Sequence, residues 1–315
     1  MAWVTWRQHR RQLLVGLAVI VGLALAALVT GLPMRTAYQR EALSSCLPPA
    51  ARSGCDIIVR HFQSEFGSGV GVARYLVLLP ALVGLFVGAP LLARELEHGT
   101  HRFAWTQTVT RRRWLLSKTL LLSLAVTLSA LVLSAIVMWW RQPFDSLEGR
   151  MSPSGFEIEG VVVPAYAVFA LALGVLAGAA LRRSLAAMSV TLAVFVAVRL
   201  AVTKLLRPHY EPPRHETMTG LVPGAHAPDW VLSNSLVDAV GTHISAGRED
   251  LAILHAQQAR IDPQEYLLSL GWRRALSFQP ADRFWTFQGI EAGIFFALAA
   301  LLVVATVWLL QRSPS

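Results

Sequence analysis

The polar segment 94–118, RELEHGTHRFAWTQTVTRRRWLLSK, holds the side chains whose types and spacing point most clearly to chemistry. Its downstream half begins with three arginines, residues 111–113, directly after a threonine that favours the start of a helix. Positive charge at a helix N-terminus is unfavourable by roughly 0.3–1 kcal/mol per residue, so helix stability does not explain these arginines. Attraction to anionic lipid explains them, at about 1 kcal/mol per residue, and so does an acidic surface on a partner protein.

The upstream half of this segment has a different composition. Glu95 and Glu97 stand just before a break at Gly99 and Thr100, and Thr100 is able to cap a short helix that presents Phe103. A segment that only lies against lipid has no need for two acids. We therefore interpret this half as a helix–break–helix finger that contacts another protein, and the alternative is a solvated loop.

Neither a nucleotide-binding nor a metal-binding pattern is present in the sequence. The phosphate-loop pattern GxxxxGK[ST] is absent, because the only two lysines, Lys118 and Lys204, do not follow a glycine at that spacing. The nine histidines show no HxxxH or HExxH spacing, which argues against a zinc hydrolase. We predict that this chain binds no metal and no cofactor of its own.

The only two cysteines, Cys46 and Cys55, have eight residues between them and follow the first apolar stretch. If this loop lies on the oxidising side of a membrane, such a pair favours a local disulfide. Two free thiols are the alternative.

Two ionisable residues lie within apolar stretches, where charged groups are costly and usually functional. Glu291 stands between Gly289 and Gly293 near the start of the last stretch. We predict a role for Glu291 in a substrate pathway, with hydration or pairing with Arg283 as its compensation. Arg199 lies well inside the fifth stretch, and we expect it to snorkel outward or to pair with another helix.

Four acids crowd the connection after the third apolar stretch: Asp145, Glu148, Glu157 and Glu159. Carboxylates close in sequence are able to share acid–base work, but they need a defined geometry to do so. We expect these four to form a solvated surface.

These residues must be positioned by helices that cross a membrane. The chain is 54% hydrophobic and only 15% charged, whereas soluble proteins carry roughly 25% charged residues. Runs of about 20 apolar residues are long enough to cross a bilayer and should be helical, because lipid offers no partners for backbone polar groups. Six such windows occur, at about residues 13–32, 72–92, 115–138, 161–181, 185–206 and 290–310. The sequence therefore predicts an all-α integral membrane protein with six transmembrane helices.

The distribution of positive charge predicts the orientation. Arginines and lysines gather at the amino terminus, in residues 94–118, at residues 182–183 and after the last window. Since positive residues collect on the cytoplasmic side, both termini are expected to be cytoplasmic. This explains the net charge of +9 without nucleic acid as a partner. The first window is too long for a typical signal peptide, so we expect it to remain as a span.

This orientation divides the chain into four parts. Residues 1–11 are expected to form an amphipathic helix on the inner membrane surface, with a plain basic flank as the alternative. Residues 12–206 contain the first five spans and a cytoplasmic loop, 94–114. Residues 207–289 are expected to form a small extracytoplasmic subdomain, with helical character around 249–261 and 264–270. Residues 290–310 form the sixth span.

Small residues spaced four apart allow helices to approach closely within three of these spans. Each pair is a candidate helix-packing site, and the pairs are Gly84 with Gly88, Gly174 with Gly178, and Gly289 with Gly293. Pro80 and Pro90 are expected to kink the second span.

The polar segment resembles a known pattern. Permease subunits of type-two ATP-binding-cassette (ABC) transporters carry E-x-G-T … P-V-S-R … G-K after the second span, and this chain is similar at Glu97, Gly99, Thr100, Val109, Thr110, Arg111 and Lys118. The segments WVTWRQHR near the start and QPADRFWTFQGIE before the last span look like the actinobacterial branch of that family.

The resemblance implies a function. Two permease subunits, identical or homologous, would form the pathway of an exporter in a bacterial plasma membrane, and separate ABC ATPase subunits would bind ATP and Mg. Membrane lipids would surround the chain, which would itself catalyse no reaction. The residues that would form the ATPase-coupling interface are Glu95, Glu97, Gly99, Thr100, Phe103 and Arg111. The alternative is a polytopic membrane enzyme with its active site in the 207–289 loop.

Overall fold

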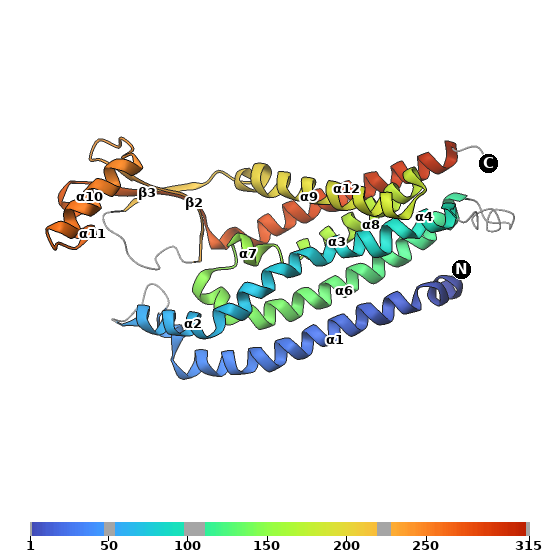
Figure 1. Ribbon diagram of the computed structural model, residues 1–315, viewed down its shortest axis with the longest axis horizontal. Helices are drawn as coiled ribbons and strands as arrows, with labels where there is room; N and C mark the ends of the chain where they lie inside the picture. Colours follow the sequence, from blue (N-terminus) through green and yellow to red (C-terminus); the bar gives the residue numbers. More distant parts are fainter. Residues whose placement is uncertain (1, 47–53, 98–110, 219–227, 313–315) are drawn as a thin grey trace.

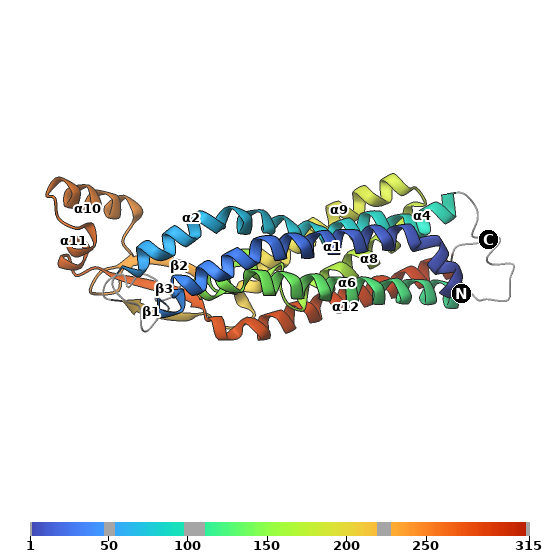
Figure 2. The ribbon, with the colours of Figure 1, turned by 90° about the horizontal axis from the view of Figure 1, so that it is seen from below.

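The computed structural model describes residues 2–46, 54–97, 111–218 and 228–312, with the backbone alone at 2–13, 56, 95–96, 111–114 and 154. The protein is mostly helical, at 79%. Figure 1 shows an elongated bundle with a small sheet at one end and both chain termini at the other, and Figure 2 shows the same arrangement from a second direction. We call these the sheet end and the terminal end.

Six helices in the described part of the chain are long and apolar enough to cross a membrane, which confirms the predicted fold class. They are Leu14–Arg40, Ile57–Arg94, Leu115–Glu148, Val162–Leu181, Ser184–His209 and Ala281–Arg312. Each contains most of a predicted window, and most of them extend beyond it.

The first and third spans lie side by side (Figure 1). They are α1 (Ala2–Arg40) and α6 (Arg111–Glu148). Because α1 begins at Ala2, residues 2–11 continue into the first span as one helix. At the sheet end, a short turn η1 (Leu43–Cys46) leads to Cys55, and Cys46 and Cys55 form a disulfide.

The second span changes its helical geometry several times. Pro80, which lacks a backbone N–H, stands at the start of a new α-helical turn. A π-helical turn follows, which begins at Gly84 and ends at Gly88. The successive elements are α2 (Cys55–Ala73), η2 (Arg74–Leu78), α3 (Leu79–Val83), η3 (Gly84–Gly88) and α4 (Ala89–Glu97).

The fourth span, α8 (Val162–Leu181), is the centre of the bundle and is almost wholly buried. Small residues make this possible. A Cβ at Gly84 would lie 2.7 Å from the Ala170 oxygen, and one at Gly88 would lie 2.6 Å from the Leu171 oxygen. Gly174 and Gly178 meet the backbone of the second span from the opposite side, whereas no described atom lies within 4 Å of a Cβ built on Gly289 or Gly293.

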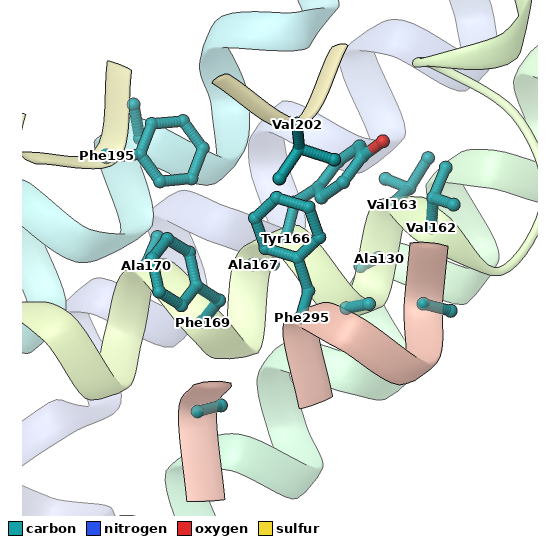
Figure 3. Packing of buried hydrophobic residues seen from close by; sticks show 14 of the residues in the cluster. Ala130, Val162, Val163, Tyr166, Ala167, Phe169, Ala170, Phe195, Val202 and Phe295 are labelled. Carbon is teal, nitrogen blue, oxygen red and sulfur yellow. The ribbon is translucent and has the colours of Figure 1, made fainter. Parts of the chain in front are cut away.

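The fifth and sixth spans pack against α8. The fifth comprises α9 (Ser184–Ala201), a π-helical turn η4 (Val202–Leu206) and η5 (Arg207–His209), and the sixth is α12 (Phe284–Arg312). Figure 3 shows the aromatic packing that joins them. The ring of Phe169 on α8 lies 6.0 Å from that of Phe195 on α9 and 5.2 Å from that of Phe295 on α12.

The segment between the fifth and sixth spans forms a mixed subdomain. Its two helices, α10 (Ala246–Gln258) and α11 (Pro263–Ser269), confirm the helical character expected around residues 249–261 and 264–270. Sequence reasoning missed the sheet. Among the described residues it has three antiparallel strands in the order β1-β3-β2, with β1 (Arg214–Met218), β2 (Trp230–Val237) and β3 (Arg273–Gln279). A short turn η6 (Ala281–Arg283) joins β3 to α12.

Candidate functional site

The candidate site is a cluster of buried charges near the sheet end of the bundle. At its centre is Glu291 on α12, whose side chain is fully buried. Arg207 donates from Nε to Oε2 at 2.8 Å and from Nη2 to Oε1 at 2.7 Å. Arg199 donates from Nη1 to Oε1 at 3.3 Å. A buried carboxylate is tolerated only when it is paired and hydrogen-bonded, and these two arginines supply both conditions.

A second carboxylate completes the charge balance. Glu157, from the connection between α6 and α8, lies 3.0 Å from Arg199 Nη2 and 3.1 Å from Arg207 Nη2. Two positive and two negative groups therefore form a neutral cluster. We call Glu157, Arg199, Arg207 and Glu291 the charge clamp.

Aromatic side chains enclose the charge clamp. The hydroxyls of Tyr166 and Tyr210 donate to Glu291, the latter at 3.1 Å. The guanidinium of Arg199 lies 3.6 Å from the ring centroid of Tyr166 on α8, a cation–π contact that strengthens when water is excluded. Burial and the nearby Glu291 carboxylate raise the pKa of Tyr210, so that its hydroxyl remains a proton donor.

The local geometry of the fifth span lets both arginines reach Glu291. Arg199 and Arg207 are eight residues apart, which in an ideal α-helix turns the side-chain direction by about 80°. The π-helical turn η4 lies between them, and its wider i→i+5 turn reduces that rotation. Arg207 Nη2 also bonds Thr203 Oγ1, one turn earlier, at 3.2 Å. The π-helical turn thus belongs to the site.

A second cluster of buried charges lies where the end of α6 meets the same connection. Glu159 is fully buried, 2.8 Å from Arg141 Nε and 3.3 Å from Arg150 Nε. Arg141 also binds Asp145 Oδ1 at 3.1 Å. Burial, followed by the negative charge of Asp145, raises the pKa of Glu159 to about 8, and the two arginines only partly oppose this effect.

The expectation that these acids form a solvated surface was therefore wrong. Asp145 and Glu159 are buried and paired with arginines, and Glu157 belongs to the charge clamp. Glu148 accepts from Gln63 Nε2 at 3.1 Å. The sequence predicted an external loop between the windows that end at 138 and begin at 161, whereas α6 continues to Glu148. The sequence showed the charges but not the helices that enclose them.

Hydrogen bonds from the sixth and third spans hold residues 149–161 inside the bundle. Gln288 on α12 donates to the carbonyl oxygens of Phe156 at 3.0 Å and Glu159 at 3.2 Å, and it accepts from Val162 N at 3.0 Å. Ser134 on α6 donates to the carbonyl oxygen of Gly160 at 2.9 Å. The connection, including the short helix α7 (Pro153–Phe156), thereby joins the third, fourth and sixth spans.

The structure decides the pairing of the two ionisable residues that the sequence singled out. Neither of the two predicted forms of compensation for Glu291, hydration or pairing with Arg283, is found, because Glu291 is fully buried and Arg283 lies 2.7 Å from Glu211 instead. Arg199 pairs with Glu291 on another helix, which confirms one of the two alternatives predicted for it. Arg207 was missed because sequence reasoning placed it at the start of a loop. The sequence did contain a signal for it, because Arg207 is a second arginine about two helical turns after Arg199.

At the terminal end, one predicted coupling residue makes a defined contact. Glu97, the last residue of α4, accepts from Ser184 Oγ at 3.0 Å and from Ser184 N at 3.4 Å. Ser184 is the first residue of α9, and a negative charge favours a helix N-terminus by about 0.3–1 kcal/mol. The second span is thus bound to the start of the fifth.

The other predicted coupling residues remain predictions. Gly99, Thr100 and Phe103 lie outside the described residues, and the structure gives only the backbone of Glu95 and Arg111. Within the described ranges, no three His, Cys, Asp or Glu residues lie close enough to hold a metal ion.

Comparison with known proteins identifies the family of this chain. The family model for ABC-2 membrane transporter related proteins matches residues 17–207, which is more than half of the chain and covers nearly all of the first five spans. The match also includes three of the four residues of the charge clamp. A search of curated proteins found no match. With six helices able to cross a membrane and a family match across most of them, the chain belongs to the ABC-2 membrane transporter related family.

Proposed function

We propose that this protein is the permease subunit of an ABC exporter that is driven by ATP hydrolysis on separate ATPase subunits. The family match over residues 17–207 is the observation that carries the proposal. The sequence supports the division of labour, because it lacks a phosphate loop that would hold ATP and Mg within this chain. The charged, buried core near the sheet end is the part of the bundle in which a functional role is expected.

The proposed docking surface for the ATPase is the 94–114 loop at the terminal end. In this proposal the terminal end is cytoplasmic and the sheet end is extracytoplasmic, in a bacterial plasma membrane. Glu97 supports this role, since it ends the second span and binds the start of the fifth. The proposed contacts are Glu95, Glu97, Gly99, Thr100, Phe103 and Arg111.

A second permease subunit, identical or homologous, is part of the proposal. The sixth span has the open small-residue surface that such a contact would use, because Gly289 and Gly293 meet no described atom within 4 Å of a Cβ. The first span also exposes most of its apolar side chains. Lipid or a second subunit would cover both surfaces.

Co-purification tests the proposed function. The tagged full-length protein, extracted from its native membrane, should bring down a protein with ABC ATPase activity. Gly99→Val and Glu97→Lys should each reduce the recovered ATPase at least fivefold. Glu249→Lys, which changes a partly exposed acid on the sheet subdomain, is the matched control and should leave recovery unchanged. Unchanged recovery with both loop variants would show that the docking assignment is wrong.

A further inference from the structure

We infer that the charge clamp joins the fifth span, the sixth span and the sheet subdomain into one rigid body. This body would carry movement from the Glu97 contact at the terminal end to the sheet end. The movement itself depends on the proposed function, because ATPase subunits would cause it. The rigidity of the body does not depend on the proposed function, because it follows from contacts within this chain.

The first argument is that α9 and α12 need a bridge. Both helices pack against α8, and the ring of Phe169 on α8 contacts aromatic rings on each of them. At the sheet end, Arg199 and Arg207 reach past Tyr166 of α8 to Glu291 on α12. The charge clamp is therefore a direct side-chain connection between the two helices across the one that separates them.

The second argument is that this bridge continues into the sheet. Strand β1 follows the fifth span, strand β3 leads into the sixth, and the two strands pair with each other, with Arg214 opposite Phe278. Gln279 at the end of β3 donates to the carbonyl oxygens of Pro208 at 3.2 Å and Glu211 at 2.7 Å. The chain segments between the charge clamp and the sheet are thus bonded to each other.

The third argument is that the same body reaches the terminal end. The fifth span runs from Ser184 to His209, 26 residues, which at about 1.5 Å per residue is roughly 39 Å. Its first residue, Ser184, donates a hydrogen bond to Glu97, which belongs to the predicted docking finger. A displacement of Glu97 would therefore act on one end of a helix whose other end is held by Glu291 and Glu157.

The charges of the clamp make a sliding movement between α9 and α12 unfavourable. Such a movement would separate Arg199 and Arg207 from Glu291, which would leave Glu291 buried without a counter-charge and the two arginines with Glu157 alone. Because each carboxylate of the clamp is held by both arginines, the cluster has one favoured arrangement, and the two spans move together or the ion pairs break. Arg207 and Glu291 are positioning residues in this proposal, and they contact no substrate in it.

Distance measurements between two spin labels test the inference. Both native cysteines are in the disulfide, so introduced cysteines are the only free thiols. Val240→Cys places one label on the sheet subdomain and Ile57→Cys places the other on α2, and these side chains are 91% and 65% exposed. Pulsed electron resonance in lipid nanodiscs then reports their separation in the full-length protein, alone and with its co-purified ATPase.

Without nucleotide, the starting protein should give a narrow distance distribution. The double variant Arg207→Gln with Glu291→Gln keeps the cluster neutral, so it should fold, and its distribution should be at least twice as wide. Arg274→Gln removes an arginine from a partly exposed pair within the sheet subdomain and should leave the width unchanged. An unchanged width in the double variant would overturn the inference, whatever the ATPase result.

With the ATPase and trapped nucleotide, the starting protein should show a shifted distance. The double variant should still hydrolyse ATP but lose at least half of that shift. A full shift in the double variant, or no shift in the starting protein during ATP hydrolysis, would overturn the inference while leaving the proposed function intact. Failure to recover any ATPase would instead count against the proposed function, and the nucleotide-free widths would still decide the inference.

Discussion

Glu291 and Glu159 are both fully buried, but their charges are compensated differently. Glu291 is bound by two arginines and accepts hydrogen bonds from two tyrosine hydroxyls. Glu159 also faces two arginines, but Asp145 lies beside it and opposes its ionisation. Both residues are glutamates, so the difference comes from the charged and hydrogen-bonding groups around each carboxyl, which determine whether its negative charge is favourable.

Glu291→Gln should destabilise the protein strongly. The substitution leaves Arg199 and Arg207 with only Glu157 as a counter-charge in a buried site. Breaking a buried ion pair typically costs about 3–5 kcal/mol, and we expect a loss on the order of 3 kcal/mol because Glu157 remains. The measurement is the denaturation midpoint in detergent. Glu249→Gln removes the acid of a partly exposed pair and should cost less than about 1 kcal/mol; equal effects would contradict the prediction.

The pH dependence of stability should contain a contribution from Glu159. Burial raises its pKa to about 8 in the folded protein, above its ordinary value of 4.5. Between these two values the folded state binds more protons than the unfolded state, so stability falls as pH rises through this window and levels off above it. Glu159→Gln should flatten this decline between about pH 5 and pH 8. Parallel stability–pH curves for the two proteins would contradict the assignment.

At the scale of elements, the central position of α8 follows from its small side chains. Gly174 and Gly178 let the second span approach on one side, while larger residues such as Tyr166 and Phe169 pack toward α9 and α12. The hydrophobic effect does not drive helices together within lipid, so close packing and buried polar contacts must do so. This span combines both, which explains why it is almost wholly buried.

Gly88→Ala should disturb the packing of the second span on α8. The added Cβ would lie 2.6 Å from the carbonyl oxygen of Leu171, and backbone cannot move aside cheaply. Overpacking of this kind costs about 1–3 kcal/mol. The yield of folded protein and its thermal midpoint should both fall. Gly71→Ala, on the same span, would meet no described atom within 4 Å and is the matched control; a drop of the same size there would refute the packing argument.

At the scale of the whole molecule, the termini and the sheet subdomain lie at opposite ends of the bundle (Figure 1). Positive residues mark the terminal end, among them Arg182 and Arg183 in the turn between the fourth and fifth spans. The disulfide lies toward the other end. This asymmetry supports the proposed orientation, in which the sheet subdomain faces the oxidising side.

Labelling of intact cells should reveal this orientation. A cysteine at Val240→Cys, on the exposed subdomain, should react with a membrane-impermeant maleimide from outside. A cysteine at Arg183→Cys, in the turn at the terminal end, should react only after the membrane is permeabilised. The reverse pattern would show that the protein has the opposite orientation.

The sequence by itself determined the six spans, because length and apolar composition are sufficient when lipid supplies no backbone partners. It also identified Glu291 and Arg199 as unusual, since charge in an apolar run is conspicuous. It did not show the sheet, whose strands 214–218 and 273–279 are short and have more than fifty residues between them. For Glu291 it offered hydration or pairing with Arg283, and the structure pairs Glu291 with Arg199 and Arg207.

Only the tertiary structure decided which charges meet. Arg207 and Glu291 are 84 residues apart in the chain, and sequence proximity favoured Arg283 instead. The packing of α9 and α12 around α8, together with the π-helical turn before Arg207, sets the directions of the side chains. The sequence shows that Glu291 and Arg199 lie within membrane-spanning helices. The three-dimensional arrangement of those helices determines which opposite charges neutralise them.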